Sequence, residues 1–182
     1  LESILKSNIN YKSLSIIFPI YNEELRLKPS FNHLKTFLKK KKSFNIEFIF
    51  VDDGSSDNSH YLLKRFAKNL KNLKKNNKFK IKIIKSKKNL GKGSALKLGV
   101  KKAVYDWILT TDIDMSVSLF QICNWINKKF INKKYYVYFG SRTHKKSIVE
   151  QEFYRKTLGD IMRFLISIIL NIKIKDTQCG YK

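Results

Sequence analysis

The feature of this sequence that most constrains its fold is an alternation of short apolar runs with longer stretches of helical period. The apolar runs are five or six residues long, they are rich in Ile, Phe and Val, and each is a candidate strand. The predicted strands cover Leu14–Phe18, Ile46–Val51, Phe79–Ile84, Trp107–Thr111 and Tyr135–Phe139. Strands that alternate with helices favour an α/β fold, in which a mostly parallel sheet is covered by helices on both faces.

Helices are predicted between the strands from apolar side chains that recur every three or four residues. This spacing places the side chains on one face of a helix, where they pack against the sheet. The predicted faces are Leu62, Phe66, Leu70 and Leu73; Leu96, Val100 and Ala103; and Leu119, Cys123, Ile126 and Phe130. Membership of the last face makes Cys123 most simply a small core residue.

Composition describes a packed globular chain of one domain with an unusual charge. The 182 residues are 43% hydrophobic, with Gly 7 and Pro 2, which excludes collagen and disordered tails. Lys and Arg number 38 against 14 Asp and Glu, and the formal net charge of +24 predicts attraction to nucleic acid, an anionic membrane or phosphorylated substrates. The two cysteines lie far apart, so neither a disulfide framework nor a zinc site is expected. No segment has the length of apolar residues that a membrane span needs, and the chain as given is expected to be soluble or peripheral.

Half of the acidic residues follow directly after three of the predicted strands. They are Glu23, Glu24, Asp52, Asp53, Asp57, Asp112 and Asp114. Loops that leave the carboxyl ends of strands line the ligand crevice of an open α/β sheet, so we expect these carboxylates in one site. Crowded carboxylates repel one another, and the cluster therefore indicates a divalent metal or a ligand rich in hydroxyl and amide groups. The simpler alternative for any single loop is that Asp and Gly form turns and helix caps, as is expected for Asp57.

Two further patterns suit a metal-bound diphosphate. In Thr110–Ser116 an extended chain would place Asp112 and Asp114 on the same side, where they can hold a metal together with phosphate oxygens. In Asn89–Ala95 the two glycines permit close backbone approach, and Lys92 adds a cation at the start of a helix, an end that already favours anions. A plain glycine turn before a helix is the alternative for this second segment.

Six motifs together resemble glycosyltransferase family 2, whose members have the Rossmann-like GT-A fold. In chain order they are PIYNEE at 19–24, VDDGSSD at 51–57, NLGKGSA at 89–95, TTDIDMS at 110–116, FGSR at 139–142 and DTQCGYK at 176–182. Within the family the chain most resembles the dolichyl-phosphate β-glucosyltransferase branch, with polyprenyl-phosphate mannosyltransferases as near relatives. The resemblance implies a catalytic domain over residues 13–182, incomplete at its carboxyl end, after a lead segment of residues 1–12.

The resemblance also implies roles for individual residues on the donor side. The residues that would bind the nucleotide sugar are Pro19, Tyr21, Glu23, Asp52, Asp53, Lys92 and Asp112. Among them, Asp52 would contact the base. Asp112 and Asp114 match the Asp-x-Asp pair that binds a divalent metal, Mg²⁺ or Mn²⁺, and the sugar nucleotide. Some relatives have Gln as a further metal ligand where this chain has Ser116.

On the acceptor side, the resemblance implies that Arg142 and Arg155 receive a lipid phosphate. A phosphate monoester is already anionic near neutral pH, because its second pKa is about 6, so such an acceptor needs no general base. A hydroxyl acceptor would need one, and Asp176 is the candidate, with a plain turn residue as the equal alternative. The predicted catalytic residues are therefore Asp114, Arg142 and Asp176.

The reaction implied by the resemblance is an inverting transfer of a hexose, most simply glucose from UDP-glucose, onto a dolichyl or polyprenyl phosphate. We expect a peripheral enzyme at the cytoplasmic face of a membrane. The segment Phe153–Ile174 supports a lipid acceptor, because it is basic and amphipathic and such a helix can lie in a membrane interface. Packing of the same apolar stripe in the protein core is the alternative.

Other functions fit parts of the sequence. A family 2 enzyme could instead use GDP-mannose, or a hydroxyl acceptor on a glycan or protein. A basic nucleic-acid-binding module would explain the charge, but it needs aromatic residues interleaved with Lys and Arg on an exposed face. Tyr135, Tyr136, Tyr138 and Phe139 are expected in a buried strand instead, and nucleic acid is therefore not an expected partner.

Overall fold

The computed structural model describes residues 13–40, 45–70, 79–128, 131, 135–142, 144, 147, 153–170, 176 and 179–182. The chain divides into two compact units, residues 1–132 and residues 133–182, and each is described by itself. Strands and helices alternate along the first unit. In chain order its elements are β1 (Ser13–Ile20), α1 (Glu24–Lys40), β2 (Asn45–Asp52), α2 (Ser59–Asn69), β3 (Phe79–Lys85), α3 (Lys92–Lys102), β4 (Ile108–Thr110) and α4 (Phe120–Asn127). The second unit contains α5 (Phe153–Leu170).

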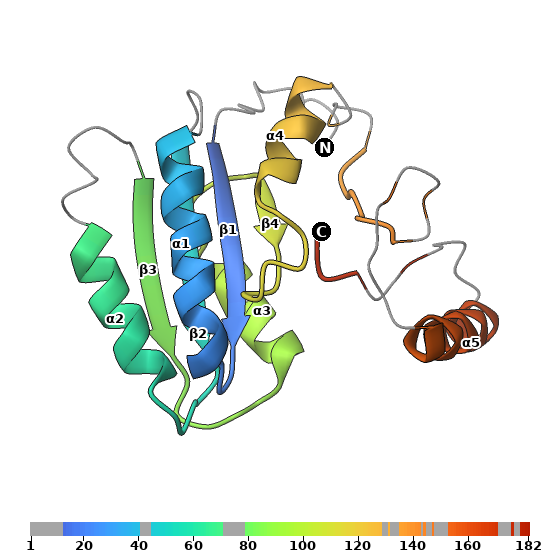
Figure 1. Ribbon diagram of the computed structural model, residues 1–182, viewed down its shortest axis with the longest axis horizontal. Helices are drawn as coiled ribbons and strands as arrows, with labels where there is room; N and C mark the ends of the chain where they lie inside the picture. Colours follow the sequence, from blue (N-terminus) through green and yellow to red (C-terminus); the bar gives the residue numbers. More distant parts are fainter. Residues whose placement is uncertain are drawn as a thin grey trace. The chain divides into compact units, whose positions relative to one another are not determined.

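The strands of the first unit form one four-stranded parallel sheet in the order β3-β2-β1-β4 (Figure 1). β1 and β2 pair along their whole lengths, beginning with Ser13 opposite Asn45. Both strands are nearly continuous apolar runs, and Ile16, Ile17 and Phe18 are fully buried, as expected for central strands that are covered on both faces. The parallel α/β sheet predicted from the sequence is confirmed.

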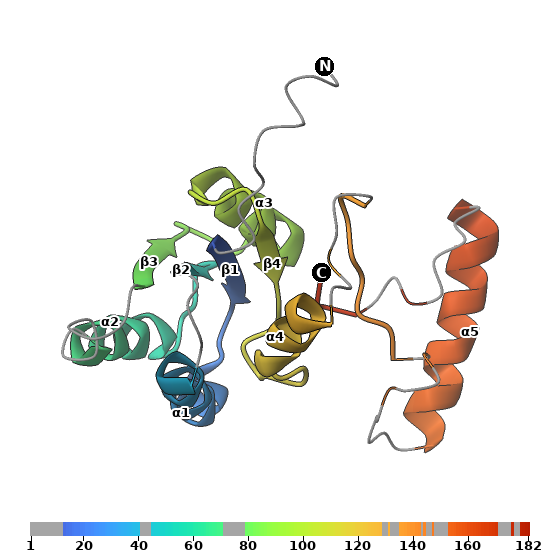
Figure 2. The same cartoon turned by 90° about the horizontal axis from the view of Figure 1, so that it is seen from above.

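Helices cover both faces of this sheet, as the alternation of elements predicted. α1 and α2 lie on one face and α3 lies on the other, which Figure 2 shows in the view from above. α1 buries Leu27, Leu34 and Phe37, and α2 buries Leu63 and Phe66. These side chains and the central strands form the apolar core that supports the loops at the ends of the strands.

The buried face of α3 lies one residue away from the predicted one. Leu96, Val100 and Ala103 were expected to face the core. Leu96 and Ala103 are partly buried and pack against it, whereas Ala95 and Gly99 are the fully buried residues and Val100 is 45% exposed. Small residues are needed because the helix lies very close to β1: a Cβ atom at Gly99 would come within 2.5 Å of Ile17 Cγ2. The larger side chains pack around this contact, a result that apolar periodicity alone does not reveal.

The fifth predicted strand is wrong. Within the described residues 135–142 the backbone forms no strand, and Tyr136 and Val137 are 69% and 62% exposed. Aromatic and β-branched residues favour strands only where a neighbouring strand and a packed surface receive them. The expectation against nucleic-acid binding that rested on burial of these aromatic side chains therefore does not hold.

Two motifs that are distant in the sequence meet in the second unit. The Gly140 N–H group donates a hydrogen bond of 2.8 Å to the carbonyl oxygen of Tyr181, and both Cys179 and Tyr181 are buried. The FGSR and DTQCGYK motifs are therefore neighbours in space. The same unit contains α5, and among the described residues no helix is both long enough and apolar enough to cross a membrane.

Candidate active site

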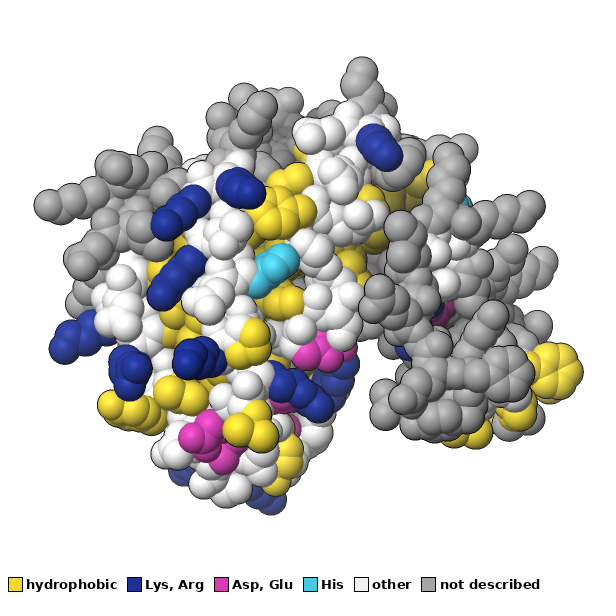
Figure 3. Space-filling model, viewed as in Figure 1, with side chains coloured by type: hydrophobic (Ala, Val, Ile, Leu, Met, Phe, Trp, Pro, Cys, Tyr) yellow, Lys and Arg dark blue, Asp and Glu magenta, His cyan; other side chains and the backbone are white. Residues whose placement is uncertain are grey.

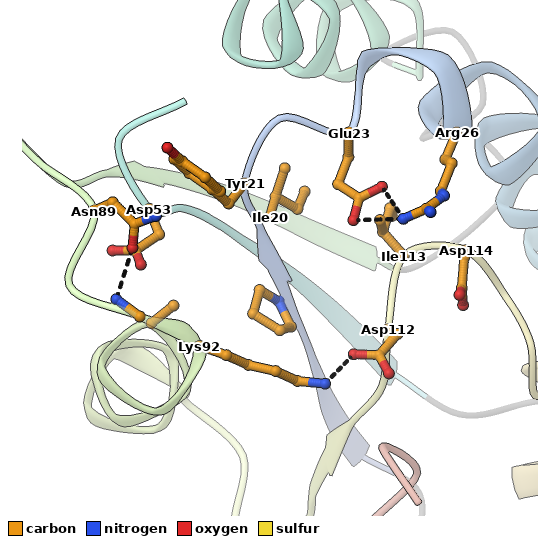
Figure 4. Close-up of a pocket in the computed structure, with 13 residues that line it drawn as sticks. Ile20, Tyr21, Glu23, Arg26, Asp53, Asn89, Lys92, Asp112, Ile113 and Asp114 are labelled. Carbon is orange, nitrogen blue, oxygen red and sulfur yellow. Dashed lines mark hydrogen bonds and ion pairs between the residues drawn. The ribbon is translucent and has the colours of Figure 1, made fainter. Parts of the chain in front are cut away.

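A pocket of about 400 Å³ lies at the carboxyl ends of β1 and β4. From β1 the chain continues to β2 and β3 on one side, and it later crosses through α3 to β4 on the other side. Open α/β sheets bind ligands at such a switch point, because the loops diverge there and leave a crevice. The residues that line the pocket are Pro19, Ile20, Tyr21, Glu23, Arg26, Asp53, Asn89, Gly91, Lys92, Ala95, Asp112, Ile113 and Asp114 (Figure 4).

Seven of the residues predicted for the nucleotide sugar or the metal line this one pocket. They are Pro19, Tyr21, Glu23, Asp53, Lys92, Asp112 and Asp114. Carboxylates from three separate loops therefore meet, as their positions after the strands predicted. Asp52 is the exception, because it is absent from the pocket lining.

Asp112 and Asp114 reach the pocket from a turn, and not from the extended chain that was predicted. Ile113 between them is buried, and its carbonyl oxygen accepts a hydrogen bond from the Ser30 hydroxyl of α1. The Ser116 N–H group donates to Asp114 Oδ1 at 3.0 Å and closes the turn. The buried Ile113 thus anchors the segment, and both flanking carboxylates line the pocket.

Lys92 and Asp112 form an ion pair inside the pocket. Lys92 is the first residue of α3, and its Nζ lies 2.6 Å from Asp112 Oδ1 (Figure 4). The side chains are 56% and 42% exposed, so water reaches the pair. A cation therefore stands beside one of the two predicted metal ligands.

Asp53 holds the glycine-bearing loop next to the pocket. Both of its carboxylate oxygens accept the Leu90 N–H group at 3.1 Å. Gly54 brings the two loops together, because it has a φ of 75° and a Cβ there would come within 2.6 Å of the Lys88 backbone. Glycine is therefore required between the acids of the VDDG motif and the loop that carries Lys92.

Asp52 lies behind the pocket wall, where its side chain is fully buried. Its carboxylate accepts the Ser55 N–H group at 2.8 Å, and its Oδ2 lies 3.0 Å from His60 Nδ1. Burial lowers the pKa of His60 and outweighs the attraction of the carboxylate, so the ring is neutral near pH 7. Asp52 therefore braces the loop after β2, and this position does not support the predicted contact with a nucleotide base.

Arg26 is a pocket residue that the sequence analysis missed. Its Nη1 donates to both carboxylate oxygens of Glu23, at 3.0 and 3.1 Å, and both side chains line the pocket. The signal that could have revealed it is the spacing of three residues between an acid and a base at a helix start, because such residues share one face of the helix. Arg26 adds a second cation to the pocket.

Asp57 has the turn and capping role that was expected for it. Its Oδ1 accepts the Ser59 N–H group at 2.9 Å, and its Oδ2 accepts the Glu24 N–H group at 3.0 Å. Burial raises the pKa of Asp57, but the hydrogen bonds that it accepts lower the pKa by more in total. The pKa of Asp57 therefore lies below its usual value. Asp57 thus joins the start of α1 to the start of α2.

In the second unit, Arg142 and Asp176 form a tight ion pair. Asp176 is 1% exposed, and its carboxylate accepts hydrogen bonds of 2.9 Å from the backbone N–H, the Nε and the Nη2 of Arg142. Hydrogen bonding to Asp176 raises the pKa of the Arg142 guanidinium. Arg155 lies in the first turn of α5, and its side chain is outside the described residues.

The donor atoms of the pocket fit a divalent metal that is shared with a ligand. Asp112 and Asp114 supply carboxylate oxygens, which Mg²⁺ and Mn²⁺ prefer, and Lys92 already places a positive charge beside Asp112. Among the described residues, no group of three or more His, Cys, Asp or Glu side chains is placed to hold a metal. A metal in this pocket would therefore take further oxygens from a diphosphate and from water.

The chain belongs to glycosyl transferase family 2, because the family model matches residues 15–181. It is 30% identical over 187 residues to the dolichyl-phosphate beta-glucosyltransferase of Homo sapiens, which covers 94% of this chain and 54% of the relative. A dolichyl-phosphate beta-glucosyltransferase of Trichomonas vaginalis is 34% identical over 178 residues, covering 93% and 52%. That of Saccharomyces cerevisiae is 32% identical over 183 residues, covering 93% and 53%. The chain spans about half the length of the curated relatives it matches.

Solved structures show a more distant likeness. The mannosyltransferase PcManGT from Pyrobaculum calidifontis, in complex with GDP-Man and Mn²⁺, is similar over 66% of this chain and 36% of its own, with 17% identity and a TM-score of 0.47. TarS from S. aureus in complex with UDP is similar over 56% and 27%, with 23% identity and a TM-score of 0.46. Likeness at this level does not transfer residue roles. Family membership and the parallel sheet place the chain in the GT-A fold that its motifs predicted.

Proposed function

We propose that this chain contributes the nucleotide-sugar site of an inverting glycosyltransferase that moves glucose from UDP-glucose to dolichyl phosphate or a related polyprenyl phosphate. The observation that carries the proposal is the meeting of aromatic, basic and acidic side chains from four separate segments in one pocket at the switch point of the sheet. Family membership supports the reaction class, and the names of the curated relatives support glucose and dolichyl phosphate.

The nucleoside part of the donor would lie at the end of β1. Pro19 and the half-exposed Tyr21 offer apolar surface to a base, and Glu23 offers carboxylate oxygens to ribose hydroxyls. Asp53 also lines the pocket. Asp52 would act as a positioning residue behind it, because its buried carboxylate holds the loop after β2.

The diphosphate would lie between the Asp-x-Asp turn and the start of α3. Asp112 and Asp114 would hold Mg²⁺ or Mn²⁺, which when bound neutralises the charge that develops on the leaving diphosphate. Lys92 and the first N–H groups of α3 form an end that favours anions. The acceptor oxygen forms a bond to the anomeric carbon of the sugar while the bond to the diphosphate breaks, so the configuration inverts.

The ion pair between Arg142 and Asp176 favours a phosphate acceptor over a hydroxyl acceptor. Asp176 is buried and accepts three hydrogen bonds from Arg142, so it is a poor candidate for the general base that a hydroxyl would need. A guanidinium that is held at Nε and Nη2 still presents Nη1, and its fork matches phosphate oxygens. We therefore assign Arg142 and Arg155 to the acceptor phosphate, and Asp176 to the orientation of Arg142.

Two surfaces suit an enzyme whose acceptor is a membrane lipid. The exposed apolar side chains of α5 are Leu158, Ile161, Met162, Phe164, Ile168 and Ile169. α1 and α2 carry many exposed Lys and Arg side chains, and Glu24 is the only acidic residue within these two helices (Figure 3). Apolar contact by α5, or attraction of α1 and α2 to anionic lipids, would hold the protein at the cytoplasmic face of a membrane.

A transfer assay with several donors tests this function. The protein is incubated with a polyprenyl phosphate and with labelled UDP-glucose or GDP-mannose, in the presence and absence of a chelator. Label is expected to pass into the organic phase from UDP-glucose only when Mg²⁺ or Mn²⁺ is available. Preferred transfer from GDP-mannose contradicts the assigned donor, and robust transfer in the presence of the chelator contradicts the assigned metal.

Donor binding is measured separately from transfer, because the chain spans about half the length of its relatives. UDP is titrated into the chain by calorimetry with and without Mn²⁺, and Asp112→Asn serves as the variant that lacks a metal ligand. UDP binding that is strengthened by Mn²⁺ in the wild type, and not in Asp112→Asn, supports the pocket. Failure of the wild type to bind UDP contradicts it.

A further inference from the structure

The ion pair between Lys92 and Asp112 crosses the pocket from α3 to the turn after β4 (Figure 4). The distance of 2.6 Å between Nζ and Oδ1 is that of a direct, charge-assisted hydrogen bond. The same carboxylate is a proposed ligand of the metal, together with Asp114 in the same turn. A metal at Asp112 would therefore be a second cation on a carboxylate that already pairs with Lys92, and the two cations cannot both lie against it at low cost.

We propose that Lys92 competes with the metal ion for Asp112 and turns to the diphosphate when the metal binds. This inference rests on the proposed function, because it concerns the metal and the diphosphate of that site. Like charges repel, so a divalent ion at Asp112 displaces the ammonium group from the carboxylate. Lysine suits such an exchange because its charge sits on a flexible stem, and the side chain is 56% exposed and has room to move.

A diphosphate bound at the start of α3 would give the released ammonium group a second anionic partner. Lys92 is the first residue of this eleven-residue helix, where the N–H groups of the first turn favour phosphate. Gly91 and Gly93 flank it, and a Cβ atom at either glycine would meet nothing within 4 Å, so the space around the helix start is open. A diphosphate at this position takes up Lys92 while the metal takes up Asp112.

This exchange of partners couples the two ligands of the pocket. A nucleotide that engages Lys92 frees Asp112 for the metal, and a metal that engages Asp112 frees Lys92 for the nucleotide. Coupling of this kind is reciprocal, so each ligand raises the affinity for the other by the same factor. The ion pair therefore keeps the affinity for the metal alone low until the nucleotide is present.

Binding of Mn²⁺ to the 182-residue chain tests the competition without any transfer reaction. Calorimetry measures the Kd of Mn²⁺ alone, of UDP alone, and of each ligand in the presence of the other. The proteins are the wild type, Lys92→Met, Lys92→Arg and Lys97→Met. Lys97→Met is the matched control, because Lys97 is an exposed lysine of the same helix that does not line the pocket.

Lys92→Met is expected to bind Mn²⁺ alone about two- to fivefold more tightly than the wild type, which is the size of effect that an exposed ion pair produces. The same variant is expected to bind UDP about tenfold more weakly in the presence of Mn²⁺, because a hydrogen bond to a charged group is lost. Lys92→Arg keeps the competing charge, so Mn²⁺ alone binds no more tightly than to the wild type. Lys97→Met changes each constant by less than roughly twofold, because a distant exposed charge is screened.

Binding of Mn²⁺ to Lys92→Met that is no tighter than binding to Lys97→Met overturns the competition. If the ion pair had a purely structural role, Lys92→Met would lower the melting temperature and weaken the binding of both ligands. For Mn²⁺ this is the opposite of the tighter binding that the competition predicts. Failure of the wild type to bind UDP in the presence of Mn²⁺ overturns the proposed function instead. The two failures are therefore distinguishable in the same set of titrations.

Discussion

The pocket of the first unit and the ion pair of the second unit use charged residues in opposite ways. In the pocket, Lys92 and Asp112 are about half exposed and Asp114 is exposed. In the second unit, Asp176 is 1% exposed and accepts three hydrogen bonds from Arg142. Charges that stay open to water can still bind a ligand, whereas buried charges must be satisfied within the protein and therefore define its geometry. The difference separates residues that would touch the substrates from residues that position others.

Replacement of an open carboxylate is expected to cost activity and not stability. Asp114→Asn removes a charge that would hold the metal, and transfer is expected to fall roughly a hundred- to a thousandfold, as when one group that stabilises developing charge is lost. The melting temperature is expected to stay unchanged, because the side chain is exposed and Asn can still accept the Ser116 N–H group. Asp106→Asn, at an exposed residue outside the pocket lining, is the control for both measurements.

Replacement of the buried carboxylate is expected to lower stability as well. Asp176→Ala leaves the Arg142 guanidinium with no carboxylate partner at this position, and the free energy of unfolding is expected to fall by about 1–3 kcal/mol. The value lies below that of a fully buried pair because the Arg142 side chain is 35% exposed and water screens its charge. Urea denaturation measures the loss, and Asp176→Asn, which keeps an acceptor, is expected to lose less. Equal stability of Asp176→Ala and the wild type would contradict the structural role of the pair.

The acceptor assignment of Arg142 predicts a change in one Michaelis constant. Arg142→Lys keeps the charge but loses the guanidinium fork, so the KM for polyprenyl phosphate is expected to rise about tenfold. The KM for UDP-glucose is expected to change by less than roughly twofold, because Arg142 does not line the pocket proposed for the donor. Initial rates with each substrate varied in turn measure both constants. A parallel rise in both would show that Arg142 does not act on the acceptor alone.

The smallest expected effect tests how a half-buried histidine of the first unit, His33, responds to pH. His33 Nε2 accepts the Leu119 N–H group at 3.3 Å at the start of α4. Burial lowers the pKa of His33, so the unfolded chain takes up a proton first, and stability is lost as the pH falls through about 6.5. Urea denaturation at about pH 7.5 and about pH 5.5 measures this loss, and the His33 share is expected to be below about 1 kcal/mol.

His33→Gln is the control for this measurement, because Gln can still accept the Leu119 N–H group and does not titrate. The variant is expected to lose less stability than the wild type over the same pH range. An equal loss in both proteins would assign the effect to His60, whose pKa is also lowered by burial.

Local sequence patterns were sufficient for the four strands of the sheet and for most of the pocket, although they also predicted a strand over Tyr135–Phe139 that does not form. Parallel strands end at one edge of a sheet, so side chains that directly follow them must converge there. Tyr21 after β1, Asp53 after β2 and Asp112 after β4 all line the pocket for this reason. Predictions that needed a distant contact were less successful. The face of α3 shifted because Gly99 lies against Ile17, and Asp52 lies behind the wall next to His60.

By itself, the sequence determined the order of strands and helices, the family and the set of charged residues near the strand ends. Only the tertiary structure decided which of those charges stay open to water and which are paired. The partners of Lys92 and of Arg142 are far from them along the chain, and a charged group responds to neighbours in space at a few ångströms. Periodicity and motif spacing are properties of neighbours along the chain, and they therefore do not contain these pairings.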